Sequence, residues 1–410
     1  MAASGNRFKA AAKYLIVIVL AVAFLMRLDY VTKYNFPEIK NDQYYYTVMA
    51  AQIIEDGVYG YKTETPNAKV PPGWPLFLVG IFKVFGYADM NHTLTVIRVF
   101  NCFFSVGMIY FIYLIGGRLF NRWAGLIAAA IATIYGPYLF VTGLILTENL
   151  FLLLFFATIY YQIRVIQDNR VSDHIIAGAL AAAATLVRPN TIIITVVPYL
   201  FLWAKHKKLF LKQIAIGAGA FAILMLPWWI RNLITMDKFI LLSQGSGNPF
   251  LAGTEPYFKK SIPWNDIDYD HQTELGIERI KQGLKDDPNT WIRWFTTGKT
   301  KAMFLRGIYA AHYFVYLDFK PWENVLRTLH KFLVYWGMSL TAIMPFIRRP
   351  YRFLAVHFFL FLGVQLLFIP ETRYTLGMMP FLMLTVAGVV TDLAGLGWKW
   401  YSARRTVRAA

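Results

Sequence analysis

The polar segment that follows the N-terminal apolar stretch places a carboxylate beside aromatic hydroxyls. Asp42 comes just before Tyr44, Tyr45 and Tyr46. A carboxylate at a bilayer surface can take a proton from an attacking hydroxyl, and Tyr46, one turn later, would share its helix face. A structural interpretation is equally open, because aspartate is a favoured helix N-cap and tyrosines are common at membrane interfaces.

Basic residues suited to phosphate follow along the chain. Lys69 stands directly before Val70-Pro71-Pro72-Gly73-Trp74-Pro75, whose prolines make the chain rigid, and a lysine there can meet phosphate as a point charge or simply be solvated. Arginine is the best bidentate phosphate ligand. Three arginines stand at the outer ends of predicted helices: Arg188, Arg231 and Arg373.

Two acids occupy similar positions. Glu148 and Glu371 stand where helices are expected to begin, and each of these charges singly can be explained by the helix dipole. Together, three arginines and two acids at one membrane level, around a loop that holds Asp42, predict a phosphate-binding pocket. Asn248, in the turn-rich stretch 245–249, is expected to line it.

Signals for metals and nucleotides are poor. Asp266, Asp268 and Asp270 resemble the start of a calcium loop, but the sixth position is His271 and the twelfth is Ile277. No HExxH, GxxxxGK[ST] or GxGxxG pattern is present. We therefore expect no cofactor and no metal site, although the pattern leaves a divalent cation open. The single cysteine, Cys102, cannot form an internal disulfide and is expected to be a buried apolar residue.

The elements that must position these residues are membrane helices. Of 410 residues, 57% are hydrophobic and 16% charged, against about a quarter charged in soluble domains. The hydropathy pattern predicts an all-α polytopic membrane protein with about ten transmembrane helices. The spans lie near 11–26, 94–116, 123–139, 149–165, 175–187, 191–204, 209–230, 326–347, 353–369 and 375–397.

Charge decides the orientation. The net charge of +18 comes largely from basic residues in short loops, which indicates membrane topology and lipid headgroups rather than nucleic acid. The positive-inside rule predicts cytoplasmic termini, an uncleaved N-terminal signal anchor, and long outer loops at 27–93 and 231–325. Only three acids would lie inside: Asp168, Asp173 and Asp392.

Both long loops look structured. Residues 43–56 and 74–85 predict interfacial helices, and 276–306 predict an amphipathic pair broken at Asp287-Pro288. No linker divides the chain, so residues 1–410 are expected to form one domain without a separate soluble C-terminal domain.

Six motifs in order resemble the GT-C glycosyltransferase superfamily, nearest to its protein O-mannosyltransferase and lipid A aminoarabinose transferase (ArnT-like) branch. They run through residues 14–390: D-x-x-x-Y from Asp42, PPGWPLF, T-E-N-L-F, L-V-R-P-N, W-W-I-R-N and E-T-R-Y. The resemblance implies a GT-C fold and an enzyme of the outer membrane face. It would move a sugar, with inversion, from a polyprenyl-phosphate donor to a hydroxyl of a lipid, glycan or protein.

The same resemblance assigns roles to residues. It makes Asp42 the catalytic base, and Lys69, Arg188, Arg231 and Arg373 the ligands of the donor phosphate. The pocket residues would be Tyr45, Tyr46, Glu148, Glu371 and Asn248. Gln43 stands where O-mannosyltransferases have a second acid, which puts a protein acceptor in doubt.

Two other classes of membrane protein fit the sequence less well. A transporter or flippase of lipid-linked glycans would usually carry ionisable groups near the midplane and paired halves, and the sequence shows neither. A scaffolding membrane protein would not need six clustered polar motifs. The expected partners are thus the lipid-linked donor, its acceptor and membrane lipids, and no nucleic acid.

Overall fold

The computed structural model describes residues 2–259, 261–264, 267–268, 271–305 and 320–409, and this part of the chain is helical, without strands. The all-α prediction is therefore confirmed. Each of the ten predicted spans falls on a helical segment. The helices concerned are α1 Ala2–Lys33, α4 Met90–Leu119, α5 Arg122–Ile134, α7 Glu148–Asp168, α8 Val171–Val187, α9 Val197–His206, α10 Leu211–Met236, α15 Lys320–Phe332 with η8 Leu333–Gly337 and α16 Met338–Ile347, α17 Arg349–Gln365 and α18 Met379–Ala409.

Fewer of these helices are long enough to cross a membrane alone. Within the described residues, five qualify by length and composition, or six if α5 is joined to α6 (Gly136–Phe140) and its continuation across a bend of 63°. The chain is a multi-pass membrane protein, but the exact count of ten is not confirmed. The reason is that several spans are broken. The span at 191–204 is a 3-10 turn, η2 Pro189–Val196, followed by α9.

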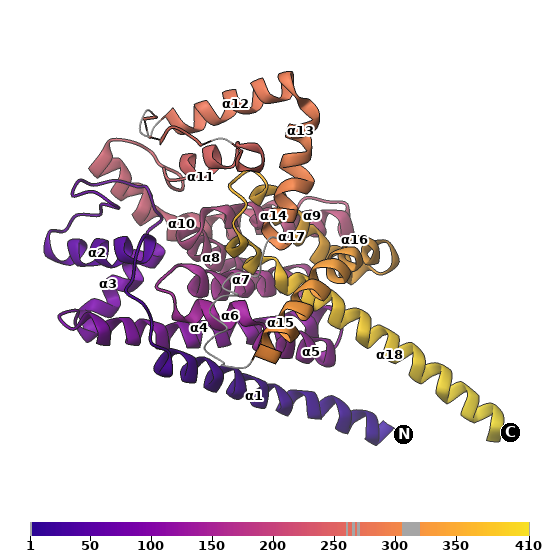
Figure 1. Ribbon diagram of the computed structural model, residues 1–410. Coiled ribbons are helices and arrows are strands. Elements are labelled where there is room, and N and C mark those ends of the chain that lie inside the picture. Colours follow the sequence, from indigo (N-terminus) through magenta and orange to yellow (C-terminus); the bar gives the residue numbers. More distant parts are fainter. Residues whose placement is uncertain (1, 260, 265–266, 269–270, 306–319, 410) are drawn as a thin grey trace.

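The centre of the molecule is a bundle of α4, α5, α7 and α8, into which the first half of α18 inserts (Figure 1). Small residues allow close helix crossings, as is common in membranes. A Cβ atom on Gly116 of α4 would lie 2.5 Å from Cα of Gly125 in α5. The helix pair α8 and α10 meets in the same way at Gly178 and Gly217.

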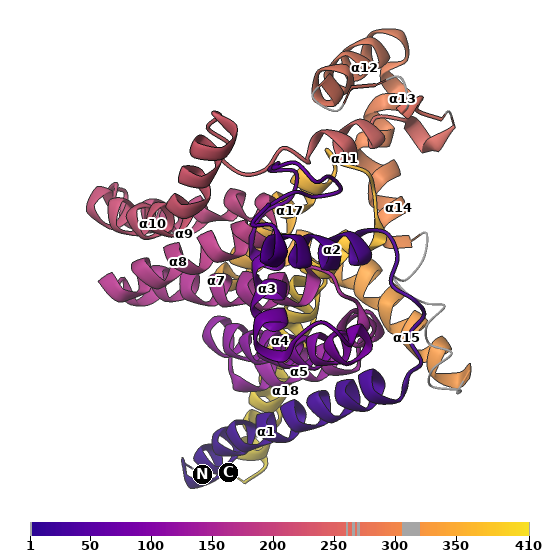
Figure 2. The ribbon, with the colours of Figure 1, turned by 90° about the vertical axis from the view of Figure 1, so that its left-hand side faces the viewer.

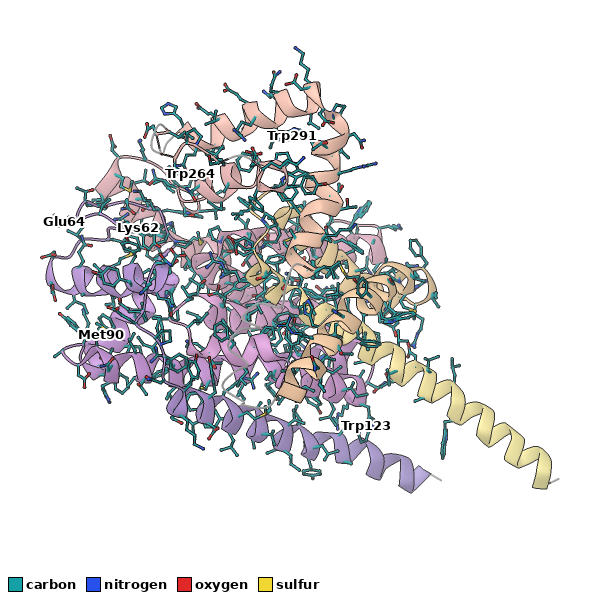
Figure 3. The ribbon with its side chains drawn as sticks, viewed as in Figure 1. Lys62, Glu64, Met90, Trp123, Trp264 and Trp291 are labelled. Carbon is teal, nitrogen blue, oxygen red and sulfur yellow. The ribbon has the colours of Figure 1, made fainter. Side chains whose placement is uncertain are left out.

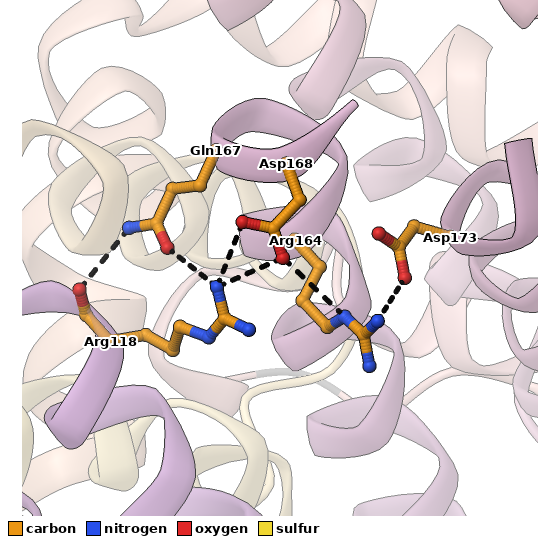
Figure 4. Close-up of polar contacts among 5 residues, drawn as sticks. All are labelled: Arg118, Arg164, Gln167, Asp168 and Asp173. Carbon is orange, nitrogen blue, oxygen red and sulfur yellow. Dashed lines mark hydrogen bonds and ion pairs between the residues drawn. The ribbon is translucent and has the colours of Figure 1, made fainter. Parts of the chain in front are cut away.

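The two ends of the bundle differ. The start of α1 and the end of α18 lie at one end, as both views show (Figures 1 and 2). Two acids predicted for that end pair with arginines in one network (Figure 4). Arg118 contacts Asp168 at 3.1 Å, and Arg164 contacts Asp173 at 2.8 Å. The third predicted acid, Asp392, pairs with Arg348.

The opposite end carries the connecting helices. α2 (Asp42–Glu55) and α3 (Gly73–Phe85) match the predicted 43–56 and 74–85. α12 (Gln272–Asp286) and α13 (Pro288–Arg293) break at Asp287, whose carboxylate accepts the N–H of Thr290 at 3.1 Å. η6 (Trp294–Gly298) and α14 (Lys299–Leu305) follow. The stretch predicted as turns holds a short helix, α11 (Gly247–Ala252), because a single helical turn can form between the glycine and proline turn signals. Figure 3 shows Lys62 beside α2, and Trp123 at the end where the chain termini lie.

Candidate active site

A cavity of about 680 Å³ opens at the end that carries α2. Its walls come from segments far apart in the sequence, so that only folding brings them together. They are the start of α2, the first loop at 61–71, the start of α7, the end of α8, the segment 243–252 and the segment 365–374.

Asp42 faces this cavity as the first residue of α2. The N-cap position belongs to Asn41, at φ 53°, and no side chain caps the helix, so the N-cap interpretation of Asp42 is wrong. Its carboxylate instead accepts a hydrogen bond of 2.8 Å from the Tyr61 hydroxyl at Oδ1. Lys62 Nζ lies 4.0 Å from Oδ1, and Arg373 Nη1 lies 3.8 Å from Oδ2. The carboxylate is thus oriented and remains 40% exposed to the cavity side.

Two tyrosines adjoin this carboxylate. Burial raises the pKa of Tyr61, and the nearby Tyr46 and Asp42 raise it further, so the Tyr61 hydroxyl stays protonated and donates. Burial, followed by the charge of Asp42, raises the pKa of Tyr46, which lines the cavity as expected. Tyr45 does not line it, because its ring lies beneath Lys62 Nζ, 4.6 Å from the centroid. Neither Tyr61 nor Lys62 was predicted, since nothing in their local pattern distinguishes them from other loop residues.

Glu148 and Arg188 form an ion pair in the cavity wall. Arg188 Nη2 lies 2.6 Å from Glu148 Oε1, whose side chain is only 1% exposed. Arg188 Nε also donates to the hydroxyl of Thr147 at 3.0 Å. The pair joins the end of α8 to the start of α7, so both charges help to shape the wall as well as line it.

The other predicted pocket residues are brought to the same cavity. Lys69, Glu371, Arg373 and Asn248 all line it. The lining includes four cationic side chains and three carboxylates. The cations are Lys62, Lys69, Arg188 and Arg373, and the carboxylates are Asp42, Glu148 and Glu371. An excess of one positive charge in a recess suits an anionic group such as a phosphate.

Arg231 lies elsewhere. It is not among the residues that line the cavity. Nη1 donates to the carbonyl of Asn67 at 3.0 Å and Nη2 to that of Tyr59 at 3.0 Å. Helix α10 runs on to Met236, so Arg231 falls a turn short of its end and faces the first loop. This geometry differs from the expected direct phosphate contact.

The sequence predicts no metal site. Within the described ranges, no group of three or more His, Cys, Asp or Glu side chains lies close enough to hold a metal ion. Asp266 and Asp270 of the calcium-loop pattern lie outside those ranges. Cys102 is buried, as predicted.

The chain is similar to several lipid-linked sugar transferases. A family model for dolichyl-phosphate-mannose-protein mannosyltransferases matches residues 69–230. The structure of ArnT from Cupriavidus metallidurans bound to undecaprenyl phosphate is 13% identical, with a TM-score of 0.53, and the match covers 92% of this chain and 60% of that one. No curated protein sequence matches.

An archaeal enzyme has a similar fold. The Archaeoglobus fulgidus oligosaccharyltransferase in its apo form is 12% identical, with a TM-score of 0.57, over 95% of this chain and 52% of that one. The AglB oligosaccharyltransferase of the same organism, in complex with an inhibitory peptide and a dolichol-phosphate, gives a TM-score of 0.56 at 12% identity, over 95% and 52%. This chain therefore spans about half to three fifths of these proteins. The predicted GT-C fold, which this chain shares with ArnT and the archaeal oligosaccharyltransferase, is confirmed.

Proposed function

We propose that this chain, which has the GT-C fold, is a membrane glycosyltransferase that moves a sugar from a polyprenyl-phosphate donor to an acceptor hydroxyl. One observation carries the proposal. A single cavity holds the oriented carboxylate of Asp42 together with cations from separate segments, Lys69 and Arg373. The similar structures with undecaprenyl phosphate and dolichol-phosphate support a donor of this class.

The proposed reaction is one displacement at the anomeric carbon. The acceptor oxygen forms a bond to this carbon while the bond from carbon to the phosphate oxygen breaks, and the electron pair leaves with the phosphate. The acceptor proton passes to Asp42. Because Tyr61 occupies Oδ1, we assign the proton to Oδ2, which faces Arg373. Attack opposite the leaving group inverts the configuration.

The cations would stabilise the leaving group. Negative charge grows on the phosphate as the bond breaks, and fixed cations in a recess stabilise such charge without reorganising. We assign this role to Lys69 and Arg373, with Arg188 supporting from its ion pair with Glu148. Such a leaving group needs neither a nucleotide nor a redox cofactor.

The outer face of the membrane is the proposed location. The cavity is lined by the start of α2. Helix α2 lies at the end of the bundle opposite the start of α1 and the end of α18 (Figure 1). Lipid-phosphate sugars suit that side, because nucleotide sugars are confined to the cytosol.

The test compares cells with and without the gene by mass spectrometry of surface glycans and lipids. We expect loss of one sugar, restored by the wild-type chain but not by Asp42→Asn at equal expression, because a positioned base contributes about 10²–10⁴-fold. Asp56→Asn, at an exposed position past the end of α2, is the matched control and should restore the sugar. If Asp42→Asn restored the sugar to within a few-fold of wild type, Asp42 would not be the catalytic base. Glu148 would then be the next candidate.

A further inference from the structure

The amide of Asn67 ties the first loop into a closed unit. Its side chain is nearly buried, at 8% exposed. Oδ1 accepts the backbone N–H groups of Tyr61 at 3.3 Å and Lys69 at 3.1 Å. Nδ2 donates to the carbonyl of Tyr61 at 3.2 Å and to the hydroxyl of Thr63 at 2.8 Å. Both ends of one amide are therefore used, and the loop closes around it.

The two residues bound by this amide each reach the cavity. Tyr61 donates its hydroxyl to Asp42, and Lys69 lines the wall. Asn67 thus connects the hydrogen-bond partner of the carboxylate to a cation of the same cavity, within a loop that has no regular secondary structure.

Neighbouring segments hold the loop from outside. Arg231 donates to the carbonyls of Tyr59 and Asn67, and the Asn67 N–H donates to Tyr59 at 3.0 Å. Gln244, within the segment 243–252, binds Ala68 twice. Its backbone N–H donates to the Ala68 carbonyl at 2.8 Å, and its Oε1 accepts the Ala68 N–H at 3.3 Å. Arg231 and Gln244 therefore hold Asn67 and Ala68, the two residues before Lys69, and so fix where Lys69 lies.

We propose that Asn67 is a positioning residue, which holds Tyr61 and Lys69 at one fixed separation so that base and phosphate ligand engage the same substrate. This inference rests on the proposed transferase function. The side-chain amide suits this role, because its oxygen accepts two N–H groups while its nitrogen donates two hydrogen bonds. Aspartate could accept both N–H groups but could not donate to the Tyr61 carbonyl or to Thr63.

The first experiment does not depend on activity. Hydrogen exchange of the backbone amides of Tyr61 and Lys69 is measured in the wild type, Asn67→Ala and Asn67→Asp. We expect both amides to exchange faster in Asn67→Ala by about tenfold, the size expected for a lost hydrogen bond. In Asn67→Asp, which keeps the oxygen acceptor, both backbone amides should stay protected from exchange. Thr63→Val is the control, because it removes the contact to Nδ2 and the bond to the Thr65 carbonyl but leaves both N–H bonds to Oδ1 in place. Unchanged exchange at both amides in Asn67→Ala would overturn the inference.

The second experiment separates positioning from simple loss of folded protein. We expect Asn67→Ala to raise the Michaelis constant for the polyprenyl-phosphate donor about tenfold, for the loss of one well-placed hydrogen bond. In a Lys69→Ala background, Asn67→Ala should leave that Michaelis constant unchanged. A fall in turnover alone, with the Michaelis constant as in wild type, would make Asn67 merely structural. A wild-type chain without transfer would instead refute the proposed function, while the exchange result still decides whether the loop is tied.

Discussion

The hydroxyl of Tyr61 donates a 2.8 Å hydrogen bond to Oδ1 of Asp42, 19 positions earlier in the chain. This bond turns Oδ2 toward Arg373, at 3.8 Å, and toward the cavity. The carboxylate is thus oriented by a residue of a loop rather than by its own helix.

Changing Tyr61→Phe should slow transfer without abolishing it. A hydrogen bond to a charged group contributes about 1.5–3 kcal/mol, so the rate should fall roughly 10–100-fold. Steady-state kinetics would measure the rate, with the exposed Tyr44→Phe as control. A wild-type rate in Tyr61→Phe would show that the bond does not matter.

Changing Arg188→Ala should destabilise the protein as well as reduce activity. It leaves Glu148 buried without its ion-pair partner, which costs about 3–5 kcal/mol. The thermal midpoint of the purified protein should drop, and Arg188→Ala with Glu148→Ala should recover part of it. Lys69→Ala should keep the midpoint and lose donor affinity alone. If Arg188→Ala kept the wild-type midpoint, the ion pair would have no structural role.

Changing Arg231→Ala should weaken donor binding more than Arg231→Lys does. The guanidinium bridges two backbone carbonyls of the first loop, which a single ammonium does less well and alanine not at all. Because the effect passes through the loop, thermal stability should fall with donor affinity. Lys238→Ala, at an exposed position nearby, serves as control. Loss of donor affinity at an unchanged melting temperature would indicate direct phosphate contact instead.

If both long loops lie outside the membrane, cysteines introduced into them should be labelled from outside the cell. Cysteines introduced at Thr65 and Lys285, both exposed, should react with an impermeant maleimide in a Cys102→Ser background. A cysteine at Lys208, between α9 and α10, should be protected until the membrane is permeabilised. Protection at positions 65 and 285 with labelling at 208 would reverse the topology.

The buried Lys299 should make the free energy of unfolding depend on pH. Burial lowers its pKa to about 7, while its Nζ donates to the carbonyl of Leu366 at 2.8 Å. The unfolded chain, with the ordinary pKa of 10.5, binds the proton more tightly between these values. The free energy of unfolding should therefore rise as pH increases from about 7 toward 10.5, by at most about 1.4 kcal/mol per pH unit. Denaturant unfolding at pH 7 and 9.5 should show a smaller rise in Lys299→Met than in the exposed control Lys301→Met. Equal rises in the free energy of unfolding of the two variants would contradict this prediction.

Local signals predicted the helices and the level of the site. Apolar runs and their polar interruptions depend on neighbouring residues, so all ten segments fell on helices, and the break at Asp287-Pro288 lies where it was predicted. Lys69 from the first loop, and Arg188 and Arg373 from outer helix ends, line one cavity, as these local signals predicted.

Contacts between distant residues were decided only by the tertiary structure. The pairing of Glu148 with Arg188, the bond from Tyr61 to Asp42 and the turn of Arg231 toward the first loop join segments separated by 19 to 172 positions. The breaks in the helices have the same origin, since packing against neighbours determines whether an apolar run continues straight. By itself, the amino-acid sequence determined which segments are helical and which charges stand at their ends, because hydropathy and charge are local properties. Which of those charges meet was decided by how the helices pack.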